Sequence, residues 1–508
     1  MKRNENTPLN IIERMNSKIS MLCAVVVLVL LVLLFNRLDY NIVQKPVEKA
    51  KKEAEEKAEA EEAAKKVPVI STASVIAVGD NLYHGSLLQA GQSDSGVWNY
   101  DKIYQHVADE IQAADLAIVD QETVLTHEHD AIASYPSFAT PTEVGDSLVN
   151  MGFDVVEHAT NHIDDYGYDF IEQTLDFWQN SHPEITYLGI HDSQEDADSV
   201  KVVTVNGIRI AFLDYTYGTN NSGAGEGREF MIDMFNVGHE KVAQMIAKAK
   251  AAADCVIFVA HWGTEDEPMP NEYEKQWANF LMKQGVDVVI GGHPHVLQPY
   301  GRLTDNEGHN MAIYYSLGNF VSTQQELPEL LGGMASFTIQ KTVTDGVTTI
   351  DILDQTVRPL VMHYNMDTGE FGPYMLEDYN DTLAAQHSVR NYIGDIFTVR
   401  NLNRKFKEVM SMNVTPSTAE SLLDVRYDWD GSMLDPQGNY VYDNDSITEL
   451  QYYGNLGLDI SSSYYSDTEL DYTAGLAKAA PSAAATESAD SVDSTDSGDV
   501  NMETDSTE

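Results

Sequence analysis

Two histidines separated by one residue, His293 and His295, form the sharpest local signal for chemistry in this sequence. Pro294 stands between them, and Gly291 and Gly292 precede them. In an extended backbone, residues i and i+2 point to the same side, so we expect both imidazoles to face one site. Imidazole is a common ligand of divalent metals, although this pair alone fits a structural role equally well.

Similar polar motifs follow apolar runs elsewhere in the chain. They are Gly79-Asp80, Asp120-Gln121-Glu122, Asn161-His162, His261-Trp262-Gly263-Thr264-Glu265 and Ser316-Leu317-Gly318-Asn319. Each alone is explained by a turn, a helix cap or a hydrogen-bonded core histidine. Together they supply carboxylates, imidazoles and amide oxygens, which suit a hard or borderline divalent cation. The carboxyl ends of neighbouring parallel strands meet at one edge of a sheet, so these motifs can converge there.

The elements that must position these motifs are short strands and amphipathic helices. The strand candidates are nearly continuous apolar runs, as expected for strands buried on both faces: Ser74–Val78, Leu116–Val119, Val155–Glu157, Cys255–Ala260, Val286–Ile290 and Ala312–Tyr315. The helix candidates between them are Pro141–Met151, Phe170–Asn180, Val237–Ala253 and Asn271–Gln284. Asn206-Gly207 predicts a hairpin within Lys201–Asp214, and Thr338–Pro359 reads as closing strands. The order is mostly βαβ, which indicates a layered α/β domain over residues 71–360.

An uncharged apolar run near the N-terminus predicts a membrane anchor over residues 19–36. The segment before it is more basic than acidic, with Lys2, Arg3, Arg14 and Lys18 against Glu5 and Glu13. The positive-inside rule therefore places residues 1–18 in the cytoplasm and the rest of the chain outside. A cleaved signal peptide is the alternative, but Asn36-Arg37 follows the run instead of a small-residue cleavage signature.

The remaining segments differ in composition. Residues 37–70 are rich in Lys, Glu and Ala, which favours a solvated helical stalk. Residues 361–475 are polar and Tyr-rich, and their pattern predicts no particular fold. Residues 476–508 combine acidic, Ser, Thr and Ala residues, so we expect a disordered tail.

Composition excludes some classes of partner. Hydrophobic residues make up 43% of the chain, which allows a sizeable core.

The formal net charge is -49, which argues against a nucleic-acid partner, because such binding needs a positive surface. Both cysteines, Cys23 and Cys255, lie in apolar runs, so no disulfide is expected.

The ordered set of motifs from Gly79-Asp80 to Asn319-Phe320 resembles the CapA family of poly-γ-glutamate capsule synthesis proteins, which are related to calcineurin-like metallophosphoesterases. The resemblance covers residues 74–340, and the membrane anchor with its outward orientation also fits the family. It implies a metallophosphoesterase-like α-β-β-α sandwich, preceded by the transmembrane helix and the stalk. Six residues match metal-ligand positions: Asp80, Glu122, Asn161, His261, His293 and His295.

Other roles follow from the same resemblance. His162 matches the histidine that protonates a leaving oxygen, and Asp120, Glu265 and Asn319 are expected to surround the ligands. There are departures: Leu82 stands where the superfamily has the histidine of Asp-x-His, Asp120-Gln121-Glu122 replaces the frequent Asn-Leu-Glu, and Thr160 begins the Asn-Asn-His-like motif.

The resulting hypothesis is a single-pass protein of the bacterial cell membrane with its C-terminal domain outside. It would act in the synthesis, export or processing of poly-γ-glutamate or a related anionic envelope polymer, alongside capsule synthesis machinery. A divalent metal, Mn, Zn or Fe, would support hydrolysis or transfer. Two alternatives remain at this point: a non-catalytic factor that binds polymer, and a surface phosphoesterase unrelated to capsule.

Overall fold

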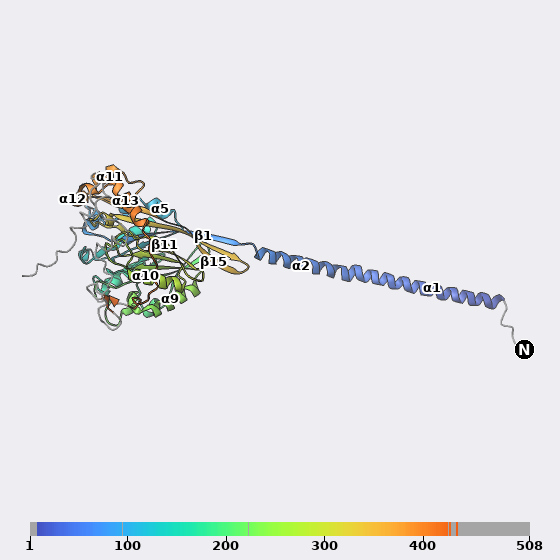
Figure 1. Ribbon diagram of the computed structural model, residues 1–508. Helices are drawn as coiled ribbons and strands as arrows, with labels where there is room; N and C mark the ends of the chain where they lie inside the picture. Colours follow the sequence, from blue (N-terminus) through green and yellow to red (C-terminus); the bar gives the residue numbers. More distant parts are fainter. Residues whose placement is uncertain (1–7, 94, 222, 425, 428–432, 435–508) are drawn as a thin grey trace, which may run out of the picture.

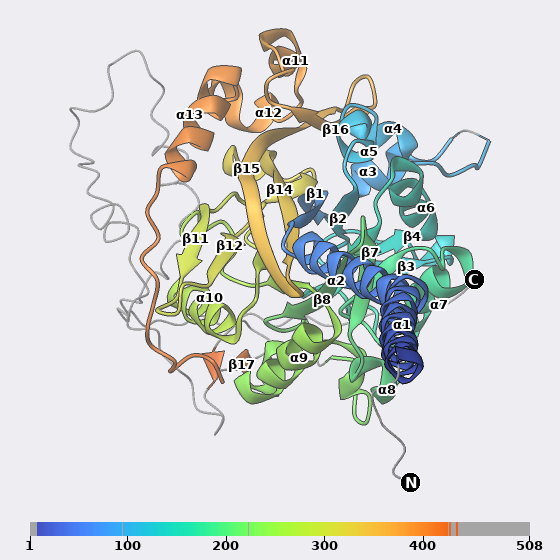
Figure 2. The ribbon, with the colours of Figure 1, turned by 90° about the vertical axis from the view of Figure 1, so that its right-hand side faces the viewer.

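The computed structural model describes residues 8–93, 95–221, 223–424, 426–427 and 433–434. Over these residues two β-sheets lie face to face, and helices cover the outer face of each sheet (Figures 1 and 2). The α-β-β-α arrangement expected from the sequence is therefore confirmed.

Eight strands make up the first sheet: β1 (Val69–Asn81), β2 (Leu116–Asp120), β5 (Val155–Glu157), β6 (Thr186–Leu188), β13 (Asn319–Val321), β14 (Leu331–Thr344), β15 (Val347–Asn365) and β16 (Glu370–Met375). Their order is β16-β15-β14-β1-β2-β5-β6, with β13 beside β1. Strands β1, β2, β5 and β6 are parallel, whereas β14, β15 and β16 join as antiparallel neighbours.

Six strands make up the second sheet: β7 (Lys201–Val205), β8 (Ile208–Thr216), β9 (Cys255–His261), β10 (Val288–Gly292), β11 (Tyr300–Thr304) and β12 (Asn310–Tyr314). Their order is β11-β12-β10-β9-β8-β7, and the four central strands are parallel. The predicted hairpin joins β7 to β8, where Asn206 and Gly207 both have positive φ, as a two-residue hairpin turn requires. A separate parallel pair is formed by β3 (Val124–Thr126) and β4 (Ala139–Pro141).

The core between the sheets consists of the side chains on their inner faces. Ile118 of β2, Val155 of β5, Ile257 of β9 and Val288 of β10 are all fully buried there. The other faces of these four strands pack against helices, so both of their faces exclude water. This explains why the strands are nearly continuous apolar runs in the sequence.

Helices cover the two outer faces. On the first sheet they are α3 (Gly85–Ala90), α4 (Asp101–Tyr104), α5 (Ala108–Gln112), α6 (Thr142–Met151), α11 (Asp381–Gln386) and α13 (Val399–Met410). On the second sheet they are α9 (His239–Ala252) and α10 (Glu272–Gln284). Asn271 and Glu274 form a capping box at the start of α10. Helix α7 (Tyr168–Asp176) continues as a π-helical turn, Phe177–Ser181, and packs beside β3 and β4; α8 (Gln194–Ala197) and α12 (Arg390–Ile393) are short.

The first sheet extends beyond residue 360, the expected end of the layered domain. Strand β15 runs through this position and β16 continues the sheet, while α11 and α13 pack on its outer face. The chain then crosses to the second sheet, where Leu422 and Leu423 join the core beneath α9 and α10. Part of the segment for which the sequence predicts no fold thus belongs to the sandwich, and the expected tail, residues 476–508, lies outside the described residues.

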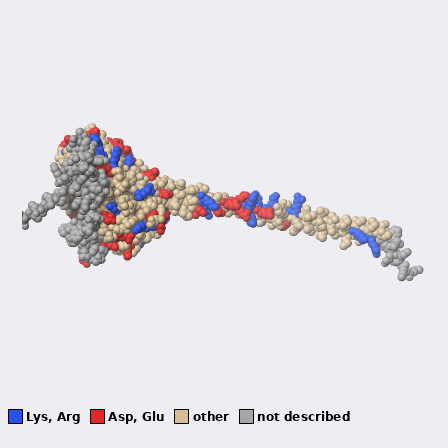
Figure 3. All heavy atoms as spheres, viewed as in Figure 1, with Lys and Arg blue, Asp and Glu red and all other residues tan. Residues whose placement is uncertain are grey.

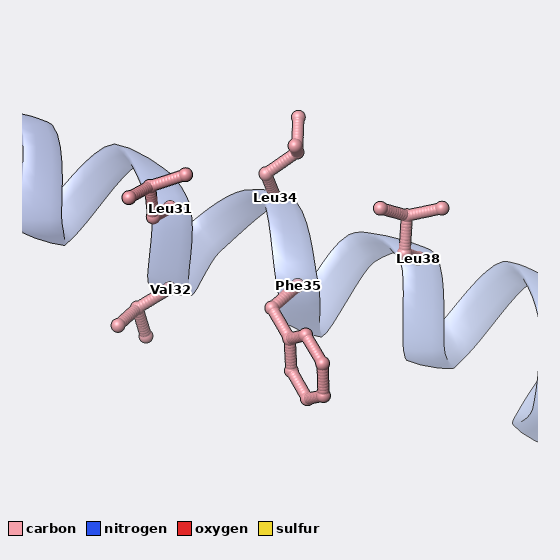
Figure 4. Close-up of a pocket in the computed structure, with 5 residues that line it drawn as sticks. All are labelled: Leu31, Val32, Leu34, Phe35 and Leu38. Atoms are coloured by element: carbon pink, nitrogen blue, oxygen red, sulfur yellow. The ribbon is translucent and has the colours of Figure 1, made fainter.

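The N-terminal segment is one nearly straight helical rod (Figure 1). It consists of α1 (Pro8–Asp39), a π-helical turn (Tyr40–Gln44) and α2 (Lys45–Lys65), with no break between them. Of the described residues, this helix alone is long and apolar enough to cross a membrane. Its apolar side chains project outward without packing on the domain; Figure 4 shows Leu31, Val32, Leu34, Phe35 and Leu38 around the helix. A charged stretch follows this apolar stretch along the rod (Figure 3).

Candidate metal centre

Polar residues gather where the parallel strands of both sheets end. Asp80 near the end of β1 lies beside Asp120 of β2 and Asn319 of β13 in the strand register. His261 ends β9 and lies beside Gly292 of β10. The polar motifs therefore meet at one edge, as predicted, and the strands that end there belong to both sheets.

Two groups of side chains could each hold a metal ion. Asp80, Glu122 and His295 form one, and Asp80, Asp120 and His261 form the other. Within each group the potential ligand atoms lie within 4.8 Å of one another, and all five residues are buried. Asp80 belongs to both groups. Asp120, which the sequence suggested only as a neighbour of the ligands, therefore stands among the potential ligands.

The contacts of His261 favour a cation at this position. Its Nδ1 lies 3.0 Å from Asp120 Oδ2, and its Nε2 lies 2.8 Å from Asn161 Oδ1. Burial is the main cause that lowers the pKa of His261 to about 4, so the ring is neutral and carries a single N–H. One ring nitrogen therefore directs a lone pair toward oxygen, an arrangement that a divalent cation would satisfy.

His293 and His295 both lie in the cluster, but the reason given by the sequence is wrong. Their φ values are 95° and 57°, so the backbone is not extended. Positive φ is unfavourable for residues other than glycine, and such strain gathers at functional sites. His295 Nδ1 lies 3.0 Å from Asp80 Oδ2 and 3.1 Å from Asn319 Oδ1. The ring of His293 lies 5.0 Å from that of His261, centroid to centroid, and its Nδ1 has no hydrogen-bond partner.

A glycine preserves the space between the carboxylates. A Cβ added to Gly292 would lie 2.8 Å from both Asp120 Oδ2 and Asp80 Oδ1. Any side chain at this position would therefore enter the cradle between the two acids. Gly79, just before Asp80, allows a close backbone approach, because its Cβ would lie 1.9 Å from the carbonyl oxygen of Gly318.

The electrostatics of the cluster also fit a cation. Both carboxylate oxygens of Glu122 and Oδ1 of Asp120 are buried without a hydrogen-bond partner. Burial, reinforced by the charge of Asp80, raises the pKa of Asp120 well above its usual range. Burial also raises the pKa of Glu122 to about 7, against the opposing charge of His295. Buried carboxylates without partners are costly, and a bound divalent ion would compensate their charge. The residues present therefore fit a metal ion.

His162 stands at the rim of this cluster and is held by a residue that the sequence analysis did not identify. Its Nδ1 lies 2.7 Å from Asp165 Oδ2, and the Asp165 side chain is almost fully buried. Burial opposes protonation, but the hydrogen bond to Asp165 and the charge of Glu122 raise the pKa of His162. The spacing of His162 and Asp165 on one turn was a signal that could have found this pair.

Asn220 was also missed. Its Nδ2 lies 3.1 Å from His162 Nδ1, and its Oδ1 accepts a hydrogen bond of 3.2 Å from Asn161 Nδ2. It comes from the loop after β8, which carries no motif that separates it from an ordinary turn. Only the fold brings it to the site.

The other predicted residues have different surroundings. Asn319 donates through Nδ2 to the carbonyl oxygen of His295, which fixes the loop that carries this histidine. Glu265 is exposed at the edge of the site, and its charge acts on His295 from a distance. Leu82, which replaces the histidine of the superfamily motif, is buried.

Comparison with known sequences places the chain in a family. The family model described as bacterial capsule synthesis protein PGA_cap matches residues 74–324. The PGA biosynthesis protein CapA of Bacillus subtilis is 30% identical over 266 residues, covering 51% of this chain and 67% of that protein. The chain belongs to the PGA_cap family. The capsule biosynthesis protein CapA of Bacillus anthracis is 30% identical over 177 residues, or 34% of this chain and 41% of that protein.

Solved structures show weaker likeness to this PGA_cap member. A phosphatase of Mycoplasma pneumoniae has a TM-score of 0.35 and 15% identity, covering 58% of this chain and 95% of its own. A hypothetical protein of Thermus thermophilus has a TM-score of 0.32 and 15% identity, covering 56% of this chain and 99% of its own.

Proposed function

We propose that this PGA_cap protein is a single-pass protein of the cell membrane whose domain lies outside the cell. It acts in the synthesis, export or processing of poly-γ-glutamate or a related anionic envelope polymer, together with capsule synthesis machinery. The proposal depends most on one observation: the buried carboxylates and imidazoles form two triads that share Asp80, with oxygens of Glu122 left unpartnered.

A divalent ion at this position would polarise the scissile carbonyl or phosphoryl group of a bound substrate. The ligands would be Asp80, Glu122, Asn161, His261, His293 and His295, with Asp120 added by its place in the second triad. Mixed imidazole and carboxylate ligands suit Mn²⁺, Zn²⁺ or Fe²⁺.

His162 supplies the proton in this account. Asp165 binds Nδ1 and fixes the ring, so Nε2 is the atom left to face a substrate. A protonated imidazole in this position can give its proton to a leaving oxygen or nitrogen as a general acid. Asn220 lies between His162 and Asn161, where its Oδ1 accepts a hydrogen bond from Asn161 Nδ2.

The second candidate function is a non-catalytic factor that binds the polymer through the same centre. The buried Leu82 favours it, because an apolar side chain stands where the superfamily has a histidine of its first motif. Both functions require the metal, and only the first requires turnover.

Metal analysis of the full-length chain purified in detergent tests the proposal. The wild type is expected to retain Mn²⁺ or Zn²⁺ and to melt at a lower temperature after chelation, because an ion that binds only the folded state stabilises it. The double variant His293→Ala/His295→Ala is expected to lose the metal. His182→Ala is the control, since His182 bonds Asp146 and Glu184 instead of the cluster. Equal metal content in the double variant and the wild type would refute the ligand assignment.

A further inference from the structure

The metal centre lies at the end of the domain opposite the stalk. Helix α2 ends at Lys65, and β1 begins only a few residues later, at Val69. The strand then runs through the sandwich and reaches Asp80 near its other end. In Figure 1 the stalk likewise joins the domain where β1 begins.

The neighbouring strands place the site at the same end. Strand β2 is parallel to β1 and delivers Asp120 beside Asp80. Strands β9 and β10 are parallel to each other and deliver His261 and Gly292 at their carboxyl ends. The 3.0 Å contact between His261 and Asp120 joins the two sets of strand ends. The whole centre is therefore distal to the stalk.

The stalk is attached firmly to the near end of the domain. Strands β14 and β15 form a long hairpin whose tip, Asp345 and Gly346, has φ values of 53° and 79°. The backbone N–H of Asp345 donates a 2.8 Å hydrogen bond to the carbonyl oxygen of Lys65, the last residue of α2. Val69 pairs with Val343 just beyond this contact. The hairpin therefore binds both the end of the stalk and the start of β1.

The stalk itself has the features of a stiff spacer. It continues the membrane-crossing helix without a break. Lys and Glu side chains form ion pairs one turn apart along α2, for example between Lys49 and Glu53 and between Lys57 and Glu61. Such pairs support an exposed helix that has no tertiary packing.

These lengths set the height of the site above the bilayer. Helix α2 has 21 residues, and a rise of about 1.5 Å per residue gives roughly 30 Å. From Val69 to Asp80, at about 3.3 Å per residue, β1 adds roughly 35 Å. A typical helix tilt of about 20° shortens this height only slightly. The centre then stands roughly 60–70 Å from the membrane surface.

We infer that the site serves polymer segments that extend into the wall space, well away from the bilayer, and not lipid-linked groups at the membrane surface. This inference rests on the proposed outward orientation and polymer substrate. It also places the site after the reaction that moves the chain across the membrane, because a chain must have left the bilayer before it can reach Asp80.

A distance measurement tests the geometry without any substrate. The full chain is placed in vesicles with acceptor dye on the lipid headgroups, in a Cys23→Ser background. A donor dye is attached either at Tyr135→Cys or at Val347→Cys, both exposed positions. Tyr135 packs by Phe138, which contacts His162, whereas Val347 lies at the hairpin tip near the stalk. We expect efficient energy transfer from position 347 and loss of most of it from position 135; equal transfer from both would overturn the inference.

Binding of a defined probe separates this inference from the proposed function. The probes are a soluble γ-glutamate oligomer and the same oligomer coupled to lipid through a short linker, each with Mn²⁺. We expect the soluble oligomer to bind and the short-linker lipid to fail, with binding restored by a long flexible linker. Equal binding of the soluble and short-linker forms contradicts the inference. Failure of the soluble oligomer contradicts the proposed function, whereas the energy-transfer result still decides the geometry.

Discussion

Asp165 binds His162 through Nδ1, and this contact orients the ring that we propose as the proton donor. The sequence was sufficient to predict that Asp80, Glu122 and His261 gather at one place, because each lies at or just after the end of an apolar strand. The sequence was not sufficient to predict that Asn220 lies at the site, because this residue is in a loop and reaches His162 only through folding. The sequence also could not predict the backbone conformation of His293, because a positive φ at a histidine has no signature in residue types.

A variant of His162 separates proton transfer from metal binding. His162→Ala should remove all but a small part of any hydrolytic activity on phosphoesters or γ-glutamyl peptides, on the order of a 10²–10⁴-fold loss. Metal content and melting temperature should stay near wild type, because its ring lies outside both metal-binding triads.

Asp165→Asn should lower the rate less than His162→Ala, since it leaves the ring in place but removes the charge that favours its protonated form. Activity of His162→Ala at the wild-type rate would mean that this histidine is structural.

The strands that lead into the candidate metal centre were the most predictable elements. The predicted Val155–Glu157 coincides with β5, and the predicted Cys255–Ala260 differs from β9 by only one residue. Helices α11 and α13 were not predicted, although the apolar residues of α13, Val399, Leu402, Phe406 and Val409, recur at helical spacing and were a signal that could have found it. Helix α11 has only six residues, so its assignment depends on its packing against the first sheet.

A histidine outside the metal centre couples the loop after β6 to the segment between β8 and α9 and should make stability depend on pH. His191 lies 3.1 Å from Asp196 through Nδ1 and 2.9 Å from Asp233 through Nε2. Burial opposes its charge, but these two carboxylates raise the pKa of His191 from 6.5 to about 9.

A raised pKa stabilises the fold below the unfolded value of 6.5, and this contribution is lost as the pH rises through about 9. The wild type should therefore lose up to about 3 kcal/mol of unfolding free energy over this range relative to His191→Asn. Denaturant titrations at several pH values measure the difference. Parallel pH profiles for the two proteins would show that His191 does not carry this charge.

At the scale of the whole molecule, a helical rod with an apolar first part and a charged stalk carries the domain (Figure 3), and the chain as a whole is acidic. The sequence predicted the apolar helix and the charged stalk, because the length and composition of these segments are enough to identify them. It held no indication of the distance between stalk and site, which depends on the direction of β1 through the sandwich.

The orientation in the membrane has its own test. The basic residues before the apolar helix predict that everything beyond Asp39 lies outside the cell. Protease added to intact, wall-stripped cells should therefore degrade the domain. Protection of the domain until the cells are lysed would place it in the cytoplasm and end the proposal.

The most direct test of the central claim is the binding of poly-γ-glutamate to the full chain with and without metal. The net charge of -49 should repel this polymer at long range, so attraction must be local and must come from the bound cation. We predict binding that needs the metal and is absent in His293→Ala/His295→Ala. Association should not slow as salt rises to physiological strength, because salt screens the repulsion over about 8 Å. Binding that persists without metal and weakens steeply with salt would reveal a basic groove and contradict the account.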